Sequence, residues 1–599
     1  MAHLEGYVSH IRFHNEENGY TVMEIETTHG DEVLVGNFHY INEGEYICAE
    51  GEYVDHPAHG PQYRMTSYTV KEPEDKAAME RYLASGAIKG MGPALAARVI
   101  KKFKGNTFDI IESEPERLAE VKGISLKKAM DIAVQFQEKQ EMRHAMMFLS
   151  EYGITSRFAV RIFEEYGNKM YDILKTNPYK LAEDITGIGF RAADAIAAKA
   201  GIAPDSDFRV CAAILYSLQQ AALSGHVYLP KDVLCRSAGQ LLSMAPEFIE
   251  DHLMELVLDK KLMIRTIGEE EHVYLSSYYF MELNTSRMLL NLDLHFPMEK
   301  GEYGRRISEL EKSMDFQLDL LQKQAVEEAL TKGVVVVTGG PGTGKTTTIN
   351  LMIRCFEMEK MDIVLAAPTG RAAKRMTEAT GLEAKTLHRL LEAKPPEGYQ
   401  KNEENPLEGD VLIVDECSMI DIVLMNALLR AIPPHMRLVL VGDIDQLPSV
   451  GAGNVLRDLM DSGVCKVVRL TKIFRQAQSS RIIMNAHRIN EGLMPDLSNG
   501  KTTDFFFTEK EDPEEAVAEI VNLVHTKLSR YYQTPSSQIQ VLTPMQKGVV
   551  GATNLNLALQ AALNPTGDGL RRSGYIFRVN DKVMQIRNNY DKEIFNGDI

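Results

Sequence analysis

The sequence has few cysteines, six in 599 residues, and no two of them form a Cys-x-x-Cys pair. Zinc ribbons and fingers need such closely spaced thiols, and a disulfide framework needs many more cysteines for its length. We therefore expect neither a structural zinc site nor disulfide bonds, and we interpret these residues as ordinary buried thiols. They are Cys48, Cys211, Cys235, Cys355, Cys417 and Cys465.

Long apolar runs and a signal peptide are missing as well. No stretch approaches the roughly 20 apolar residues that a membrane-spanning helix requires. The chain begins Met1-Ala2-His3-Leu4-Glu5, without the basic and apolar blocks of a secretory signal. We expect a cytoplasmic protein with no membrane partner.

An excess of positive charge is also absent, because the formal net charge is −18. A negative total disfavours a nucleic-acid partner, yet binding depends on local stripes of Lys and Arg rather than on the sum, so the total leaves the question open. Hydrophobic residues make up 44% and charged residues 25%, which is typical of folded domains. The length predicts about three to five domains.

A strand, a glycine-rich loop and a helix follow one another in the middle of the chain. Val334–Val337 predicts a strand buried on both faces, and the apolar spacing from Thr346 to Glu359 predicts a helix. Glycines in the intervening loop let backbone N–H groups point at a phosphate, and the helix N-terminus adds partial positive charge. The predicted nucleotide-binding residues are Gly340, Pro341, Gly342, Thr343, Gly344, Lys345, Thr346 and Thr347.

Lys345 in this loop would reach the β- and γ-phosphates, and the Thr346 hydroxyl would bind Mg²⁺. A plain glycine turn is the alternative, but the complete G-x-x-x-x-G-K-T string between a strand and a helix disfavours it. The sequence therefore predicts an ATP or GTP site.

Two carboxylates, Asp415 and Glu416, follow the buried strand predicted at Val411–Val414. Asp415 can hold Mg²⁺ together with Thr346, and Glu416 can orient and polarise the attacking water. Acidic pairs at strand ends are common by chance, but this pair follows a phosphate loop. The combination favours nucleotide hydrolysis.

Two further polar residues come after later strands. Gln446 follows the strand at Leu438–Val441 and is a plausible sensor of the γ-phosphate. Arg475 follows the strand at Val467–Leu470, from which a guanidinium could reach the γ-phosphate across a cleft. An isolated arginine is more often a solvated surface residue, so Arg475 depends on the other motifs for its interpretation.

The N-terminal part divides into a β region and a helical region. Residues 1–72 alternate apolar and polar positions between turn signals, which predicts a small antiparallel barrel or sandwich; an oligonucleotide-binding (OB) barrel fits, as do unrelated small barrels. Residues 73–210 show helical periodicity, and 211–315 read as a helical, winged-helix-like linker domain.

Three glycine turns interrupt the helical region, and they resemble helix-hairpin-helix motifs, whose backbone N–H groups contact DNA phosphates. Gly90 with Gly92 and Gly187 with Gly189 are the predicted DNA-contacting glycines. The middle turn carries Ser125 in place of its second glycine, which favours a packing role. A helical bundle with glycine C-caps is the alternative for all three turns.

From about Leu318 onward, short apolar strands alternate with helices, as in a buried parallel sheet. The predicted fold class is α/β, a P-loop NTPase with two RecA-like lobes, preceded by a small β-barrel and an α-helical (helix-hairpin-helix) region. We place the first lobe at 316–463 and the second at 464–577, and Ile539–Leu542 is the last predicted strand.

Six ordered motifs resemble those of superfamily 1 helicases of the RecD-like branch, and the barrel and hairpin repeats resemble the long form of that branch. Gln322 matches the family's adenine-reading glutamine. The resemblance implies a DNA-dependent ATPase that uses ATP and Mg²⁺, moves 5′→3′ on single-stranded DNA and unwinds 5′-tailed duplexes. We also expect a role in DNA repair or recombination and a monomeric protein, although the sequence itself determines neither the pathway nor the oligomeric state. The motifs are Thr338 to Thr348, Ala367 to Ala373, Lys385 to Leu391, Val414 to Met419, Gly442 to Pro448 and Ile473 to Gln476.

The family resemblance also implies a DNA channel that contacts backbone and bases without reading sequence. In the family, residues corresponding to 394–405 hold a β-hairpin pin that splits the duplex; a surface loop is the open alternative. The predicted channel residues are Pro368, Thr369, Arg371, His388, Pro544 and Met545.

The chain ends at Ile599, inside what the family makes an SH3-like insertion beginning near Arg578. By resemblance, later motifs that supply DNA contacts and a second arginine are missing, so we expect the second lobe and the 578–599 segment to be incomplete and the activity to be low. A DNA-binding scaffold with a nucleotide-dependent switch is the rival. A relaxase fused to a helicase is disfavoured, since no histidine cluster lies beside a tyrosine.

Overall fold

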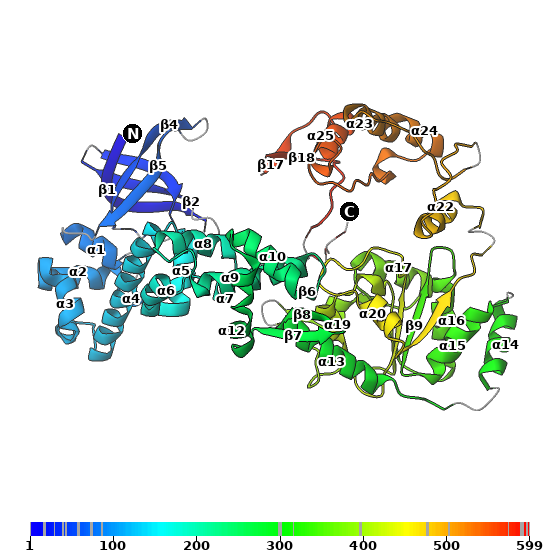
Figure 1. Cartoon of the computed structure of the whole chain (residues 1–599). Coiled ribbons are helices and arrows are strands. Elements are labelled where there is room, and N and C mark those ends of the chain that lie inside the picture. Colours follow the sequence, from blue (N-terminus) through cyan, green and yellow to red (C-terminus); the bar gives the residue numbers. More distant parts are fainter. Residues whose placement is uncertain are drawn as a thin grey trace. The chain divides into compact units, whose positions relative to one another are not determined.

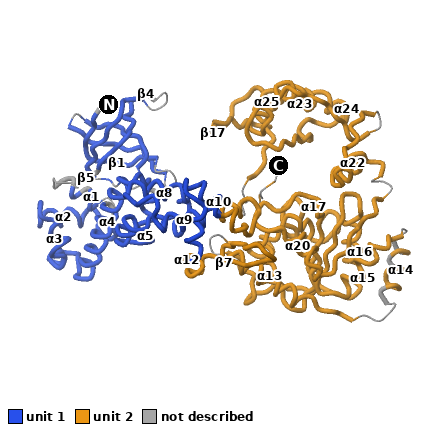
Figure 2. The backbone as a smooth tube through the Cα atoms, in the orientation of Figure 1, with its two compact units in different colours: residues 1–217, 235–254 blue, residues 218–234, 255–599 orange. Residues whose placement is uncertain are grey.

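The computed structural model describes residues 2–15, 20–28, 30–38, 41, 43, 45–56, 60–71, 76–84, 88–297, 302–314, 317–394, 398–474, 478–500, 503–572, 574–586, 592, 594, 597 and 599. The chain forms two compact units (Figure 2). Residues 1–217 and 235–254 make unit 1, and residues 218–234 and 255–599 make unit 2. No helix among the described residues combines the length and the apolar character needed to cross a membrane.

Unit 1 begins with a closed barrel in the strand order β1-β2-β3-β5-β4 (Figure 1). Alternate residues point inward, so Met23 and Ile25 of β2 are fully buried beside Leu34 and Tyr63. Parallel pairing of β3 with β5 closes the barrel. The predicted small barrel is confirmed. Its strands are β1 Ala2–His14, β2 Tyr20–Thr27, β3 Gly30–Asn37, β4 Tyr46–His56 and β5 Gly60–Lys71.

The rest of unit 1 is helical, as predicted from the 3.6-residue periodicity. The amphipathic α2, for example, buries Leu95, Ala96, Val99 and Ile100 on one face and exposes its lysines on the other. The helices within unit 1 are α1 Lys76–Ala84, α2 Pro93–Phe103, α3 Thr107–Ser113, α4 Leu126–Glu151, α5 Ser156–Tyr166, α6 Met170–Thr176, α7 Lys180–Asp184, α8 Phe190–Lys199 and α11 Pro246–Glu250. Three more helices have residues in both units: α9 Asp207–Leu223, α10 Lys231–Leu242 and α12 Leu253–Leu258.

Unit 2 contains a small antiparallel sheet in the order β6-β8-β7, followed by the long helix α13. The strand pair predicted around 263–265 and 273–275 is therefore present. A third strand, β6, was not predicted, because its three residues include Pro230 and show no alternation. The elements are β6 Tyr228–Pro230, β7 Leu262–Ile267, β8 Glu270–Leu275 and α13 Ser276–Leu292.

A six-stranded parallel sheet forms the centre of unit 2, in the order β11-β10-β14-β15-β9-β16. The neighbours of β9 are β15 and β16, so its backbone pairs on both edges and its side chains are covered on both faces. The sheet strands are β9 Val334–Gly339, β10 Ile363–Ala367, β11 Ala384–Thr386, β14 Val411–Val414, β15 Arg437–Gly442 and β16 Lys466–Leu470.

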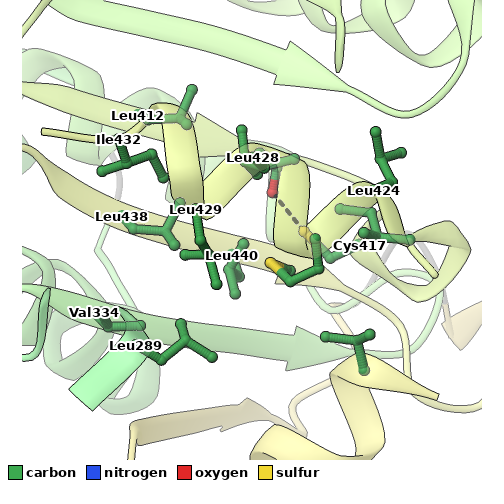
Figure 3. Close-up of a cluster of buried hydrophobic side chains, with 14 of the residues drawn as sticks. Leu289, Val334, Leu412, Cys417, Leu424, Leu428, Leu429, Ile432, Leu438 and Leu440 are labelled. Atoms are coloured by element: carbon green, nitrogen blue, oxygen red, sulfur yellow. Dashed lines mark hydrogen bonds between the residues drawn. The ribbon is translucent and has the colours of Figure 1, made fainter. Parts of the chain in front are cut away.

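The four valines of β9 are each at most 1% exposed, and they divide between the two faces of the sheet. Val335 and Val337 pack with apolar residues of α15 and α16. Val334 and Val336 pack with α13 and α19, on the face shown in Figure 3, where Leu289 lies beside Val334. The covering helices are α14 Glu302–Met314, α15 Leu320–Thr331, α16 Lys345–Met358, α17 Gly370–Thr380, α18 Leu387–Leu390, α19 Ile422–Ala431 and α20 Val455–Ser462.

Two predictions about the second lobe are wrong. The strand at 466–470 was assigned to the second lobe, but it pairs in parallel with β9 and so extends the first lobe's sheet past the predicted boundary at 463. The strand predicted at Ile539–Leu542 does not form, and Leu542 is 89% exposed. An apolar run forms a buried strand only when it can pair with a neighbouring strand and pack against the rest of the sheet.

Beyond residue 470, the described residues form helices and one antiparallel hairpin rather than a parallel sheet. The hairpin begins in the segment predicted as second lobe and ends at Arg578. These elements are α22 Arg481–Asn490, α23 Pro513–Asn522, α24 Leu528–Tyr532, α25 Ala552–Leu563, β17 Gly569–Arg572 and β18 Tyr575–Arg578.

Candidate nucleotide site and DNA-contacting segments

The glycine-rich loop connects β9 to α16 as the sequence predicts. Gly342 and Gly344 have φ angles of 78° and 83°, a left-handed region that residues with a Cβ atom seldom adopt. Gly344 is also the N-cap of α16, so the loop presents backbone N–H groups together with a helix N-terminus. The buried Thr343 hydroxyl donates to the Gly340 carbonyl at 2.8 Å and fixes the turn.

Lys345 extends from the first turn of α16 back over the loop. Its Nζ donates to the Gly339 carbonyl at 2.5 Å and lies 3.8 Å from Oδ2 of Asp443, at the end of β15. Asp443 is 3% exposed. Gln446 lies beside the same carboxylate, with its Nε2 at 3.5 Å from Oδ2. Asp443 belongs to the motif from Gly442 to Pro448 but is not among the predicted site residues, although a carboxylate directly after a buried strand is a usable signal.

Asp415 and Glu416 lie where β14 ends, and β14 is the strand next to β15 in the sheet. The Glu416 N–H donates to Oδ1 of Asp415 at 2.8 Å. Glu416 has a φ of 54°, which non-glycine residues rarely adopt and which is concentrated at functional sites. Its Oε2 is buried without a hydrogen-bond partner among the described residues. An unpaired buried carboxylate oxygen is suited to accept from a water molecule.

Burial raises the pKa of Asp415, and the nearby positive charges of Lys345 and Arg375 partly offset this by lowering it. Burial also raises the pKa of Glu416, and the adjacent Asp415 carboxylate adds to that effect. Two carboxylates with raised pKa at one strand end form a site that a cation would stabilise. Arg375 of α17 was missed in the sequence, since nothing local distinguishes it from other exposed helix arginines.

Gln322 lies beside the phosphate loop and is 1% exposed. Its Oε1 accepts from the Asp319 N–H at 3.1 Å in a capping box that starts α15. Its Nε2 has no partner among the described residues, and a Cβ atom on Gly344 would lie 2.7 Å from it. A buried unpaired donor next to a phosphate loop fits a purine base, which offers ring-nitrogen acceptors.

The donor set fits Mg·ATP. The loop supplies N–H groups and Lys345 for the phosphates, Gln322 supplies the unpaired donor, and the Thr346 hydroxyl and the Asp415 carboxylate are oxygen ligands of the kind that Mg²⁺ takes. Thr346 is exposed at the start of α16, and Thr347 follows it. Arg475 lies outside the described residues.

Four of the predicted DNA-contacting residues lie at neighbouring strand ends. Pro368, Thr369 and Arg371 follow β10, and His388 follows β11, which pairs with β10 up to Ala367 and Thr386. Thr369 caps α17 by accepting from the Ala372 N–H at 3.2 Å. Pro544 and Met545 are exposed in an irregular segment, and among the described residues no hydrogen bond joins them to this group.

The segment after α18 contains a short antiparallel pairing of β12 Ala393–Lys394 with β13 Gly398–Tyr399. Within 394–405 this pairing includes Lys394 and Gly398–Tyr399, while 400–405 form no strand and 395–397 lie outside the described residues, so the pin and the surface loop both stay predictions. The Tyr399 ring lies 6.0 Å from the His388 ring, so the hairpin meets the predicted DNA-contacting group.

The three predicted turns of the helical region share one geometry. Gly90, Gly123 and Gly187 have φ angles of 90°, 105° and 100°, and each turn closes with an N–H···O bond of 3.1 to 3.2 Å. Each following helix starts at an N-cap, which is Gly92, Ser125 or Gly189. Ser125 accepts from the Lys128 N–H at 3.3 Å, so serine fulfils the capping role there.

A fourth turn of this kind, at Gly153, was missed. Gly153 has a φ of 76°, and Thr155 is the N-cap of α5. Arg161 donates to the Thr186 carbonyl of the last turn at 2.9 Å. Arg98 likewise donates to the Lys122 carbonyl of the second turn. In both cases an arginine on the helix after one turn donates to a carbonyl of the following turn. Because this arrangement occurs twice, the region is a duplicated pair of hairpins.

Comparison with known proteins assigns families to most of the chain. "ATP-dependent DNA helicase YrrC, OB-fold domain" matches residues 1–73, "SAM-like Helix-hairpin-helix tandem" matches 81–138, and "ATP-dependent RecD2 DNA helicase HHH domain" matches 138–228. "AAA domain" matches 322–452, and "ATP-dependent RecD-like DNA helicase SH3 domain" matches 555–599.

Two curated relatives, RecD2 and RecD, agree with these families. The chain is 31% identical to the ATP-dependent RecD2 DNA helicase of Deinococcus radiodurans, over 99% of this chain and 83% of that protein. It is 34% identical to the RecBCD enzyme subunit RecD of Mycolicibacterium smegmatis, over 46% of this chain and 56% of the subunit. The Pif1 helicase of Candida albicans matches at 22% identity with a TM-score of 0.25, over 35% of this chain and 55% of that structure.

Proposed function

Because this chain belongs to the RecD2-like family of ATP-dependent DNA helicases, we propose that it moves 5′→3′ along single-stranded DNA and unwinds duplex ahead of it. The proposed setting is DNA repair or recombination. The observation that supports the motor most strongly is the sheet edge that carries the phosphate loop, Lys345, Asp415, Glu416 and Asp443 together.

In the proposed ATP site, Lys345 leaves the Gly339 carbonyl and binds the phosphates, whose charge the loop N–H groups also meet. Glu416 orients the attacking water through its unpaired Oε2. Thr346 and Asp415 would hold Mg²⁺, which neutralises phosphate charge when bound. Gln446 senses the γ-phosphate, and Arg475 stabilises the charge that develops on it.

The proposed direction is tested with matched duplexes carrying a single-stranded tail of equal length at either the 5′ or the 3′ end. We expect strand separation of the 5′-tailed duplex with ATP, and less than about a tenth of that rate with the 3′ tail. Equal rates would contradict the direction, and ATP hydrolysis without separation of either duplex would favour the scaffold hypothesis.

Gln322 is proposed to read the adenine base. Gln322→Glu keeps the acceptor for the Asp319 N–H but replaces the unpaired Nε2 donor with an oxygen, so the cap of α15 stays while the base contact is lost. We expect the KM for ATP to rise about tenfold and the preference for ATP over GTP to fall. The measurement is steady-state hydrolysis with each nucleotide.

The control for this variant is Gln324→Glu on the same helix, two residues along. It introduces the same charge without removing the donor beside Gly344, so its KM should stay within about twofold of wild type. An unchanged ATP preference in Gln322→Glu would contradict the assignment.

The hairpin turns are proposed to hold DNA through phosphates. At Gly92 and Gly189 an added Cβ would meet nothing within 4 Å, and neither φ is positive, so a side chain fits. Aspartate is a good N-cap but repels a phosphate, so Gly92→Asp with Gly189→Asp should weaken DNA affinity about tenfold while preserving the helices. Fluorescence anisotropy at several salt concentrations measures the effect.

Gly105→Asp is the matched control, because Gly105 also has open space and a permitted φ but lies outside the turns. Its affinity should equal that of wild type. Phosphate contacts also predict an affinity that falls steeply with salt and varies little with base sequence. A strong sequence preference at fixed salt would count against the hairpins as phosphate contacts.

A further inference from the structure

Every carbonyl from Gly339 to Gly342 accepts a hydrogen bond, but the donors come from two places. Two of them belong to the phosphate loop and the first turn of α16. The other two come from the chain after β16, more than 130 residues later. The pairs are Lys345 Nζ to Gly339 at 2.5 Å, Thr343 Oγ1 to Gly340 at 2.8 Å, His487 Nε2 to Pro341 at 3.2 Å, and Phe474 N–H to Gly342 at 3.2 Å.

His487 makes the more informative of the two distant contacts, because a side chain can be replaced. Pro341 offers only an acceptor, so Nε2 of His487 must carry the proton. The ring also lies close enough to Gly340 that a Cβ atom added there would be 2.7 Å from Cε1 of His487. Gly340 does not have a positive φ, so contact with His487 is one reason for glycine there.

The helix that carries His487, α22, is itself braced. Asn485 is 2% exposed and exchanges two hydrogen bonds with the backbone of Asp496, at 2.8 and 3.0 Å. Ser480 caps the helix, and its hydroxyl and the Arg481 N–H both donate to Asp504. A movement of the phosphate loop at Pro341 would therefore move α22 together with Asp496 and Asp504, rather than one side chain.

We propose that His487 is a positioning residue that couples the phosphate loop to α22. Loop N–H groups face a bound phosphate, while the Pro341 carbonyl faces away from it toward His487, so both contacts can be made at once. Nucleotide binding and release then shift α22, and α22 in turn holds the loop in its hydrolytic arrangement. This role rests on the proposed function, in which DNA bound to the motor stimulates hydrolysis.

Two near-isosteric replacements separate this role from a structural one. A glutamine amide reaches the position of the imidazole Nε2, whereas an asparagine amide reaches only that of Nδ1. His487→Gln should retain at least about half of the DNA-stimulated kcat, and His487→Asn should lose about tenfold, with KM for ATP within about twofold in both. His525→Asn, at an exposed histidine of the same unit, should behave as wild type.

A double-mutant cycle tests the contact itself. Gly340→Ala pushes the ring away from Pro341, so it should cost about as much as His487→Asn, and the double variant should be no worse than either single. If the double variant lost about a hundredfold in DNA-stimulated kcat, the product of the two single losses, the coupling would be overturned. A fully active His487→Asn would overturn it as well. Wild-type turnover that DNA does not stimulate would instead overturn the proposed function.

Discussion

Lys345→Ala is expected to lower ATP turnover about a thousandfold or more, because the variant loses the one side-chain cation that the phosphate loop itself carries. In the described site the ammonium is 2.5 Å from the Gly339 carbonyl and 3.8 Å from Asp443, within reach of any phosphate that enters the loop. Removing it also leaves the buried Asp443 carboxylate without its ion pair. Nucleotide affinity should therefore fall together with turnover.

The control is Lys312→Ala on α14, an exposed lysine of the same unit, which should leave both kcat and KM within about twofold of wild type. Lys345→Met keeps most of the side-chain volume and should be as inactive as the alanine variant. If the methionine variant hydrolysed ATP at a tenth of the wild-type rate or more, charge would not be what Lys345 contributes.

The phosphate loop and the carboxylate pair could be predicted because their geometry is local. Four valines can only be covered on both faces, and a glycine-rich loop before a helix has few conformations, so β9, the loop and α16 formed where expected. Asp415 and Glu416 needed one further rule, that parallel strands end at the same edge of a sheet. Gln322 was found through a family resemblance, and burial beside Gly344 agrees with it.

Features that depend on distant parts of the chain could not be predicted. The residues of a strand do not determine which sheet the strand joins. The strand at 466–470 was therefore predicted in the wrong lobe, and residues 539–542 were wrongly predicted to form a strand. His487 contacts a residue 146 positions earlier, and Arg375 of α17 acts electrostatically on the two carboxylates that follow β14. The turn at Gly153 was missed because the motif was expected to have glycine at the N-cap of the following helix, where this turn has Thr155.

Glu416→Gln is expected to separate binding from hydrolysis. The amide keeps the size of the side chain but cannot polarise water as a carboxylate does, so turnover should fall about a hundredfold or more. Affinity for Mg·ATP should stay within about threefold, because the phosphates are held by Lys345 and the loop, and removing a carboxylate beside Asp415 relieves repulsion. Equilibrium binding of a fluorescent ATP analogue and steady-state hydrolysis measure the two effects.

Glu357→Gln on α16 is the matched control, since it makes the same exchange at an exposed position and should change neither quantity. Lys345→Ala and Glu416→Gln should both lose at least about a hundredfold in turnover, but only Lys345→Ala should also lose nucleotide affinity. A variant that binds ATP but hydrolyses it slowly should also remain on single-stranded DNA in the ATP-bound state without separating a duplex. Equal loss of affinity in Glu416→Gln and Lys345→Ala would show that Glu416 holds the nucleotide, and the attacking water would need another base.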